Sequence, residues 1–346
     1  MTRRQGSMTD FKGKINRFDS FTKCKSLILG QINWTLVDLI QDPDKRDYTY
    51  AFLEDFNETL EFISNICKKF NIHVDRPTVV PYDEKIKYVH PNFELSAVKN
   101  PISPSDSFLC LSDTIVEVAS VQETAFFDYV QYRDIWNRYF DNGSKWMAAP
   151  IPTHDPKQWN GFDYFDFAEP LFDGACVEPV GNKAFISNNV VMNPRGKKWL
   201  ERMFPEYEFI IVPKTRGHLD SFFRILKPGV IYSAIGKSDL PECFKNWTLI
   251  EAIKTEYQPP EIVSEFLQDD DYDNTVLDVN GFSIDEENFL MMEHTFQQRP
   301  EVVRQIESHG VNCIPVPFDS CRFLNQGMAC IMNATHREGS LFDYFK

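Results

Sequence analysis

The chain has 346 residues, of which 42% are hydrophobic, and a formal net charge of −15. This length suffices for one large core or for two domains. So acidic a surface repels phosphate backbones, and we therefore expect no nucleic-acid partner. No apolar run approaches the length of a membrane span and no signal-peptide core follows the first residues, so we expect no membrane association.

The cysteines indicate a reducing compartment. The sequence contains 8 of them, far apart, and no two form a CxxC pair. This pattern does not support a zinc ribbon or a thioredoxin-like redox motif. A chain of this size does not need disulfides, so we expect reduced thiols and a cytoplasmic location.

The predicted elements begin with a buried strand at 25–30 and an amphipathic helix over 50–70. We expect residues 1–17 to form a disordered tail and 18–346 a single domain, because no linker-like stretch divides the chain. The remaining elements follow in chain order: a hairpin over 106–119 turned at Ser112-Asp113, a helix over 122–140 ended by Asn142-Gly143, strands at 183–187 and 190–192, a helix over 195–203, strands at 209–212, 222–225 and 230–233, a hairpin over 280–292, a helix over 300–309 and a strand at 311–316.

This order repeats a strand–strand–helix unit about five times. No GxGxxG or GxxxxGK[ST] motif is present, which argues against a dinucleotide-binding or P-loop fold. Hairpins also interrupt any regular βαβ series. The pattern predicts an α/β fold of similar modules in a closed or radial arrangement, with the functional site at the hub.

Several short stretches carry the residues needed for covalent catalysis by an activated nucleophile. Cys330 supplies a thiol, Asp173 and Asp106 supply carboxylates, and His218 and Asp220 would face the same side of a strand. Each also fits a structural role: a buried thiol, a capping aspartate or, more commonly for an isolated His-x-Asp, a hydrogen-bonded histidine. Spacing alone therefore does not establish a site.

Four stretches, in this order and with this spacing, resemble the amidinotransferase family, which moves the amidino group of arginine to an acceptor amine. They are the helix and loop over 125–153, Pro-Leu-Phe-Asp at 170–173, Gly-His-Leu-Asp at 217–220 leading to Pro-Gly at 228–229, and Gly-Met-Ala-Cys at 327–330 followed by Arg-Glu-Gly at 337–339. The resemblance extends from about residue 18 to the C-terminus. It implies the pentein fold, a five-module pseudosymmetric α/β-propeller, in agreement with the repeated unit.

The resemblance also implies roles. Cys330 would be the nucleophile, His218 the general acid and base, and Asp173 the carboxylate that orients His218. Asp106 and Asp220 would hold the planar guanidinium by charge-assisted hydrogen bonds. In such a ping-pong transferase the thiolate attacks arginine, ornithine leaves and an amine takes the amidino group, without cofactor or metal. The partners are therefore small molecules, arginine and the amine acceptor, and a homodimer stays open.

Some positions depart from the family pattern and bear on the substrates. Ala329 stands where relatives usually have His, and Gly217 where the glycine-using enzymes have Met, so an acceptor larger than glycine would fit. Lys237 falls where a family arginine binds the donor carboxylate, and a lysine pairs there as a point charge. Asn274, near a family serine pair, and Arg322, at the start of the nucleophile stretch, complete the candidate substrate-binding residues.

Two alternatives stay open. A hydrolase of the same fold, similar to arginine deiminase, would pass the group to water, and the resemblance over 125–153 argues against it. A non-catalytic binding relative would keep the fold without the chemistry. The joint presence of thiol, imidazole and carboxylates argues against that second alternative.

Overall fold

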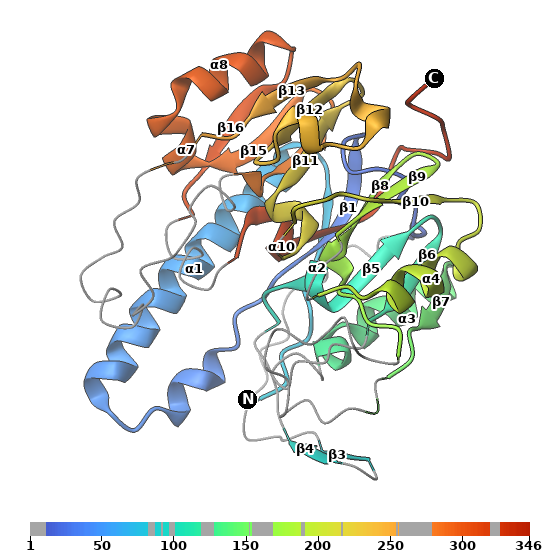
Figure 1. Ribbon diagram of the computed structural model, residues 1–346. Helices are drawn as coiled ribbons and strands as arrows, with labels where there is room; N and C mark the ends of the chain where they lie inside the picture. The colour runs from blue at the N-terminus through green and yellow to red at the C-terminus, as the bar shows by residue number, and fades with distance from the viewer. Residues whose placement is uncertain are drawn as a thin grey trace.

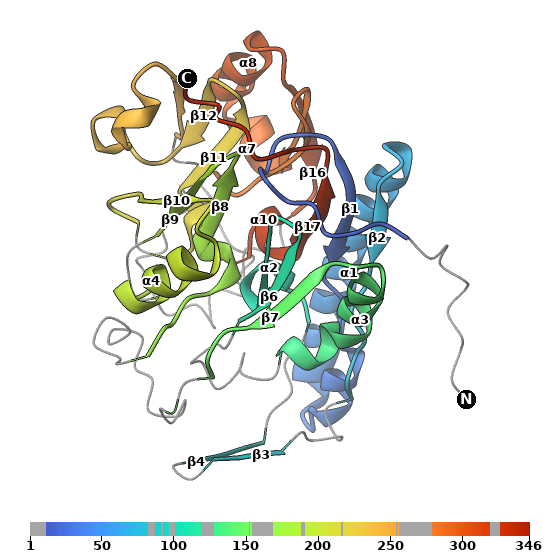
Figure 2. The same ribbon diagram turned by 90° about the vertical axis from the view of Figure 1, so that its right-hand side faces the viewer.

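A computed structural model describes residues 12–81, 87–90, 93–96, 101–118, 128–151, 153, 169–187, 191–215, 217–253, 255, 279–318 and 326–346. These residues build five three-stranded sheets around a common centre, as predicted (Figures 1 and 2). The strands of the five sheets are, in order, β17 (Met332–Arg337), β1 (Cys24–Leu29) and β2 (His73–Asp75); β5 (Phe108–Leu111), β6 (Thr114–Glu117) and β7 (Lys145–Ala148); β8 (Val177–Val180), β9 (Lys183–Ile186) and β10 (Glu208–Ile211); β11 (Phe223–Lys227), β12 (Val230–Ser233) and β13 (Thr248–Glu251); β14 (Phe282–Asp285), β15 (Asn288–Met292) and β16 (Asn312–Val316).

All five sheets share one pattern of pairing. The middle strand pairs antiparallel with the inner strand and parallel with the third strand. A parallel pair needs a crossover, and a helix usually supplies it. The helices that follow the middle strands are η1 (Trp34–Leu39) and α1 (Pro43–Lys69), η2 (Asp128–Tyr132) and α3 (Arg133–Asp141), α4 (Pro194–Met203), the turns η7 (Lys237–Asp239) and η8 (Glu242–Phe244), and α7 (Glu293–Gln298) and α8 (Pro300–Ser308).

The first sheet closes the ring, because its inner strand comes from the end of the chain. β17 pairs antiparallel with β1, and Leu27 lies opposite Ala334. The N-terminal segment joins the same seam, since Asn16 bridges to His336 and Ile15 is buried. Residues 12–17 are therefore ordered, and the disordered tail predicted over 1–17 extends too far into the chain.

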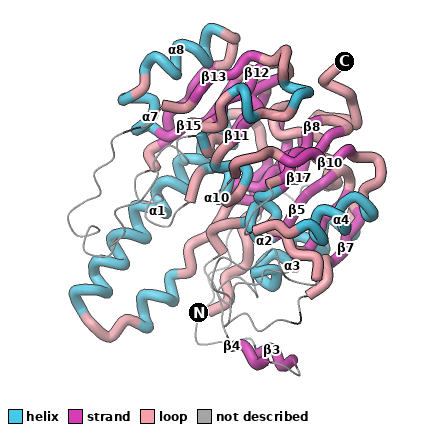
Figure 3. Tube along the Cα trace, in the orientation of Figure 1, coloured by secondary structure: helices cyan, strands magenta, loops and turns pink. Residues whose placement is uncertain are grey.

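α1 shows why the outer helices form where they do. Asp42 caps its N-terminus by accepting hydrogen bonds from the backbone N–H groups of Asp44 and Lys45, and Pro43 occupies the first turn. The buried side chains recur at helical spacing and face the sheets: Leu53, Phe56, Leu60, Ile63 and Cys67. Figure 3 shows this long helix along the outside of the molecule. The cap places its start earlier than the predicted residue 50.

Three further predictions need correction. The segment 190–192 is no strand in its described part: Met192 makes only an isolated bridge with Phe172. The helix predicted over 122–140 is, in the described residues, η2 followed by α3. The strands β7, β8, β13 and β17 were not predicted. Pro179 conceals β8, the polar Thr248 and charged Glu251 at the two ends conceal β13, and the polar residues of 332–337 conceal β17. A separate hairpin joins β3 (Lys87–His90) and β4 (Phe93–Ser96).

Short helical turns lead into the inner strands and lie at the centre of the ring. They are α2 (Pro104–Ser107), η5 (Gly174–Cys176), η6 (Leu219–Ser221) and α10 (Met328–Ile331). Figure 2 shows α2 and α10 surrounded by the sheets. Close approach is required here, since a Cβ on Gly174 would lie 2.4 Å from the carbonyl oxygens of Ser105 and Phe108. Within the described ranges, no helix combines the length and apolar character needed to cross a membrane.

Candidate active site

The central turns carry the residues that the sequence singled out. Asp106 lies in α2, Asp173 immediately precedes η5, His218 immediately precedes η6, Asp220 lies within η6, and Cys330 lies within α10. Residues more than two hundred positions apart in the chain therefore meet because each occupies a similar place in its module. The fold itself creates the cluster.

His218 lies between two carboxylates. Its Nε2 is 3.2 Å from Asp173 Oδ2, a hydrogen bond, and its Nδ1 is 3.3 Å from Asp106 Oδ1, an ion pair. The Asp173 side chain is almost fully buried, at 6% exposed, whereas that of His218 keeps 21% exposure. The imidazole is thus fixed from behind and still open on one side.

The neighbouring carboxylates stabilise the protonated imidazole. Burial favours the neutral ring, but Asp106, Asp173 and Asp220 outweigh it and raise the pKa of His218 to about 10. At neutral pH this histidine is therefore an imidazolium. A charged imidazole held in this way can donate a proton to a leaving group.

Cys330 faces a different set of partners. Its Sγ lies 3.7 Å from Asp220 Oδ2 and 3.2 Å from Asn280 Nδ2, which donates a hydrogen bond to the sulfur. The residue is buried, at 3% exposed, and belongs to no disulfide. Burial, with the carboxylates of Asp220 and Asp106, raises the pKa of Cys330 well above its ordinary value, so the resting sulfur is a thiol.

Asp220 links the two halves of this site. Burial raises its pKa, while His218 and Arg224 act in the opposite direction. The sequence pattern predicted that Asp220 and His218 lie on one strand, and this prediction is wrong, because η6 is a 3₁₀ turn. Both side chains nevertheless reach the same cluster, because the turn rather than strand alternation directs them.

Asn280 is a residue of the site that sequence reasoning missed. It precedes β14, is fully buried, and accepts a hydrogen bond from the Ala329 N–H at 2.7 Å through Oδ1 while its Nδ2 donates to Cys330. A Cβ on Gly327 would lie 2.1 Å from Asn280 Cγ, so the glycine is needed for close approach. The only available signal was its place before an inner strand, as for the other central residues.

Ser105 joins α2 to α10. Its hydroxyl donates to the carbonyl oxygens of Ala329 and Cys330, the latter at 2.8 Å. The carboxylate-bearing turn and the thiol-bearing turn are therefore fixed to each other directly. This contact holds Asp106 and Cys330 in one framework.

The structural roles left open for the aspartates do not account for them. Asp173 occupies the position before η5, yet its side chain makes no capping hydrogen bond. Asp106 lies inside α2, which begins after Ser103. Both carboxylates are instead directed at His218.

The remaining candidates are the predicted substrate-binding residues Lys237, Gly217, Asn274 and Arg322. Lys237 is exposed, and its Nζ donates to the Trp247 carbonyl oxygen at 3.4 Å. Gly217 borders open space, since a Cβ there would meet nothing within 4 Å. Asn274 and Arg322 lie outside the described residues. Their roles, and those of Lys237 and Gly217, stay predictions.

Known proteins of similar sequence are amidinotransferases. No family model matches the chain. The mitochondrial glycine amidinotransferase of Gallus gallus is 28% identical over 318 residues, which cover 83% of this chain and 70% of that protein. An inosamine-phosphate amidinotransferase of Streptomyces griseus is 24% identical over 296 residues, 82% of this chain and 81% of that protein.

Solved structures agree with this resemblance. That of an inosamine-phosphate amidinotransferase from Streptomyces griseus superposes with a TM-score of 0.80 at 20% identity, covering 96% of this chain and 99% of the other. The chain is a pentein-fold relative of the amidinotransferases. SxtG, an amidinotransferase of saxitoxin biosynthesis from Microseira wollei, gives a TM-score of 0.76 at 22% identity over 95% of this chain and 99% of the other.

The pentein fold also includes other enzymes. DDAH from Pseudomonas aeruginosa superposes with a TM-score of 0.57 at 15% identity, covering 90% of this chain and 99% of the other. The sequence matches confirm the predicted resemblance and transferase class, and the superposed structures confirm the predicted fold.

Proposed function

We propose that this protein transfers the amidino group of arginine to an acceptor amine larger than glycine, through a covalent amidino-cysteine on Cys330. One observation carries the proposal: a buried thiol and an imidazolium share a cluster of carboxylates at the hub of a pentein fold. The relatives named above transfer amidino groups, which supports the same reaction class here.

The acidic cluster suits a guanidinium. Arginine's guanidinium is planar, permanently charged and offers N–H donors in a fixed fork. Asp106 and Asp220 supply acceptors, and Asp220 already contacts the sulfur that would attack the central carbon. Binding therefore brings the cation and the nucleophile together.

The bound cation would also activate the thiol. The carboxylates of Asp220 and Asp106 oppose ionisation of Cys330. A guanidinium between them offsets that negative charge and favours the thiolate, while the Asn280 amide donates a hydrogen bond to it. Because His218 is already protonated, the thiol proton would leave to water when arginine binds, and the nucleophile would thus form where its substrate is bound.

The two half-reactions then balance through His218. The thiolate attacks the guanidinium carbon, the tetrahedral adduct collapses, and His218 gives its proton to the departing amine of ornithine. The acceptor amine attacks the amidino-cysteine, His218 takes its proton, and the thiolate leaves. Asp173 and Asp106 keep the imidazole in place and stabilise its charged form.

Two small residues favour a large acceptor. Gly217 precedes His218 and Ala329 precedes Cys330, so both small residues flank the chemistry. The space beyond Gly217 would admit an amine larger than glycine. Asn274, Arg322 and Lys237 are proposed to contribute to binding, Lys237 to the arginine carboxylate.

The proposal is tested by incubating the purified protein with arginine and a panel of amines, and measuring ornithine and guanidino products. Ornithine formed only in the presence of an amine, with a matching guanidino product, is the expected result. Citrulline formed without an amine would identify a hydrolase instead. Faster turnover with glycine than with any longer amine would reject the proposed acceptor class.

Intact mass measures the intermediate independently. Arginine alone should add the mass of one amidino group to the wild type and none to Cys330→Ala. Absence of both adduct and ornithine would indicate a non-catalytic relative.

A further inference from the structure

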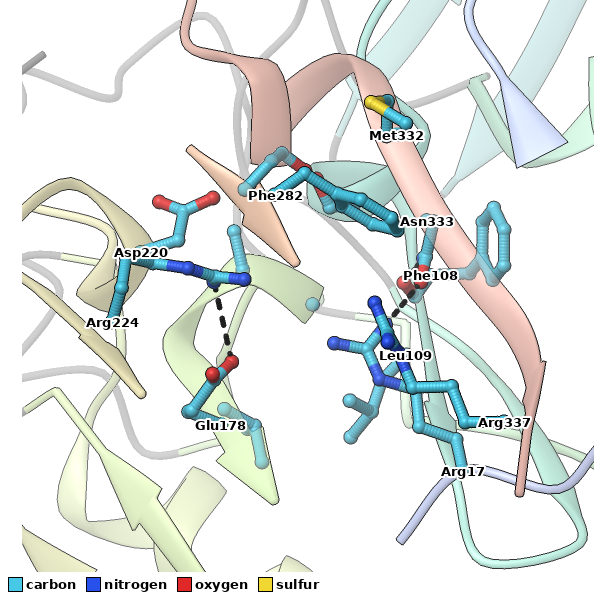
Figure 4. Close-up of a pocket in the computed structure, with 15 residues that line it drawn as sticks. Arg17, Phe108, Leu109, Glu178, Asp220, Arg224, Phe282, Met332, Asn333 and Arg337 are labelled. Carbon is cyan, nitrogen blue, oxygen red and sulfur yellow. Dashed lines mark hydrogen bonds and ion pairs between the residues drawn. The ribbon is translucent and has the colours of Figure 1, made fainter. Parts of the chain in front are cut away.

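A small cavity lies at the hub, on the strand side of the central turns. Its volume is about 20 Å³. Asp220, Ala329 and Ser105, from three of these turns, contribute to its lining. Figure 4 shows Arg224 and Glu178 across the cavity from Arg17 and Arg337, and these charged side chains come from different modules.

Only one of the three arginines has an acidic partner among the described residues. Arg224 and Arg337 are 3% and 0% exposed. Among the described residues, Arg224 pairs with Glu178 at 3.4 Å, whereas neither Arg17 nor Arg337 forms an ion pair. Arg337 donates to the backbone carbonyls of Thr22 and Ser283 instead, and Arg17 donates to Asn333 Oδ1 at 2.8 Å.

Donor groups are left over inside this cluster. The Nε–H groups of Arg17, Arg224 and Arg337 are buried and have no hydrogen-bond acceptor in the described part of the chain. A buried cationic donor without an acceptor is costly, and native structures normally satisfy it with protein, water or an ion. Figure 4 places Arg17 and Arg337 on one side of the cavity and the Arg224–Glu178 pair on the other.

The charge of the lining is also unbalanced. Three guanidinium groups face two carboxylates, those of Glu178 and Asp220, which leaves one positive charge. Asp19 lies within electrostatic reach of Arg337, but it accepts hydrogen bonds from Thr22 and does not line the cavity. One monovalent anion would complete the balance.

We propose that this cavity is a binding site for one halide-sized monovalent anion, held by the guanidinium groups of Arg17, Arg224 and Arg337. Its size fits, because roughly 10–15 Å³ already accommodates a water molecule. An oxyanion such as sulfate or phosphate is too large. The site is separate from the catalytic groups but shares Asp220 with them.

Thermal unfolding of the full chain tests the proposal. Sodium chloride or bromide is compared with sodium gluconate at equal ionic strength, because gluconate is too large to enter. A ligand that binds only the folded state raises the melting temperature saturably, here by about 2–4 °C at ten times its dissociation constant. Equal curves in halide and gluconate overturn the proposal.

Bromide located by anomalous diffraction gives the position. Crystals of the wild type in bromide should show an anomalous peak between the guanidinium groups, and a cavity that holds only water, with bromide elsewhere or absent, overturns the proposal. This measurement needs no variant, so it decides the matter even if a substitution prevents folding.

Arg17→Gln supplies the matched variant. It removes one cation without leaving a carboxylate unpaired, and it should weaken the halide effect on melting at least tenfold in midpoint concentration. Arg304→Gln, an exposed position on α8, is the control and should keep the wild-type response. An unchanged response in Arg17→Gln would contradict the assignment.

Discussion

The two reactive groups of the candidate active site, one on each side, differ in their charge. On one side His218 lies between Asp106 and Asp173, and its pKa is raised to about 10, so the ring is charged. On the other side Cys330 is more completely buried, and its nearest partners are the carboxylate of Asp220 and the amide of Asn280. Its pKa is raised too, and the sulfur is therefore neutral.

The difference shows that partners, more than burial, decide which group is ionised. The imidazolium has its counter-ions in the protein, whereas a thiolate would add a third negative charge near Asp220 and Asp106. The thiol side thus lacks a cation that the imidazole side already contains. A guanidinium substrate would supply it.

The largest effect is expected when the thiol is removed. Cys330→Ala should lower ornithine formation by at least about 10⁴-fold, because no other group can form the covalent intermediate. Cys313→Ala, in β16 and outside the site, is the control and should stay within a few fold of the wild type. Activity retained in Cys330→Ala would show that Cys330 is not the nucleophile.

The imidazole side is tested by His218→Asn. Turnover should fall by about 10²–10⁴-fold, the usual contribution of a general acid and base. Stability gives a second readout. Because the folded-state pKa of His218 is raised from 6.5 to about 10, its stabilising contribution is fully present below about pH 6.5 and is lost as pH rises through 10.

Urea unfolding of wild type and His218→Asn from pH 6.5 to 10.5 measures that contribution. The gap in the free energy of unfolding should narrow with rising pH by at most about 4 kcal/mol. Cys330→Ala keeps the imidazole and its carboxylates, so it should follow the wild-type pH dependence. A gap that widens with pH would show that His218 is neutral in the folded protein.

Much of this architecture could be predicted from the sequence. The repeated strand–strand–helix unit gave the radial fold, and the ingredients Cys330, His218, Asp173, Asp106 and Asp220 meet at the hub. What the local pattern could not provide is closure: β17 has polar residues such as Asn333, His336 and Arg337 and completes a sheet with β1. A polar inner strand has no hydrophobic signal.

The site was predictable in its chemistry and not in its geometry. A 3₁₀ turn, rather than a strand, directs His218 and Asp220, and the alternation of polar residues around them does not reveal this turn. Asn280 was missed for a related reason. Its neighbours Val279 and Gly281 form no motif, and its importance depends on contacts with Ala329 and Cys330 from the other end of the chain.

Asn280→Ala removes the hydrogen bond to the Cys330 sulfur and is expected to have a smaller effect than the two substitutions above. A hydrogen bond to a charged group contributes about 1.5–3 kcal/mol, so kcat should fall by about 10–100-fold. Because the amide favours the thiolate, the pH profile of Cys330 alkylation should also move to higher pH. Asn312→Ala, exposed in β16, is the control. A lower kcat with an unchanged alkylation profile would show that Asn280 positions the Ala329 backbone without acting on the sulfur.

The smallest effect concerns the residues that precede the two reactive groups. Gly217 stands before His218 on one side and Ala329 before Cys330 on the other, and neither takes part in the chemistry. A longer side chain at Gly217 would fill the space that is open there and should slow a large acceptor by about tenfold, the scale of steric discrimination in a pocket.

Gly217→Met is therefore expected to lower kcat/KM for the preferred amine while leaving the amidino-cysteine half-reaction with arginine unchanged. Gly217→Ala is the conservative control and should show a smaller loss. Measuring the two half-reactions separately, by adduct formation and by adduct decay, assigns the effect. If adduct formation slows and decay does not, Gly217 borders the donor and not the acceptor, and the space beside the imidazole belongs to arginine.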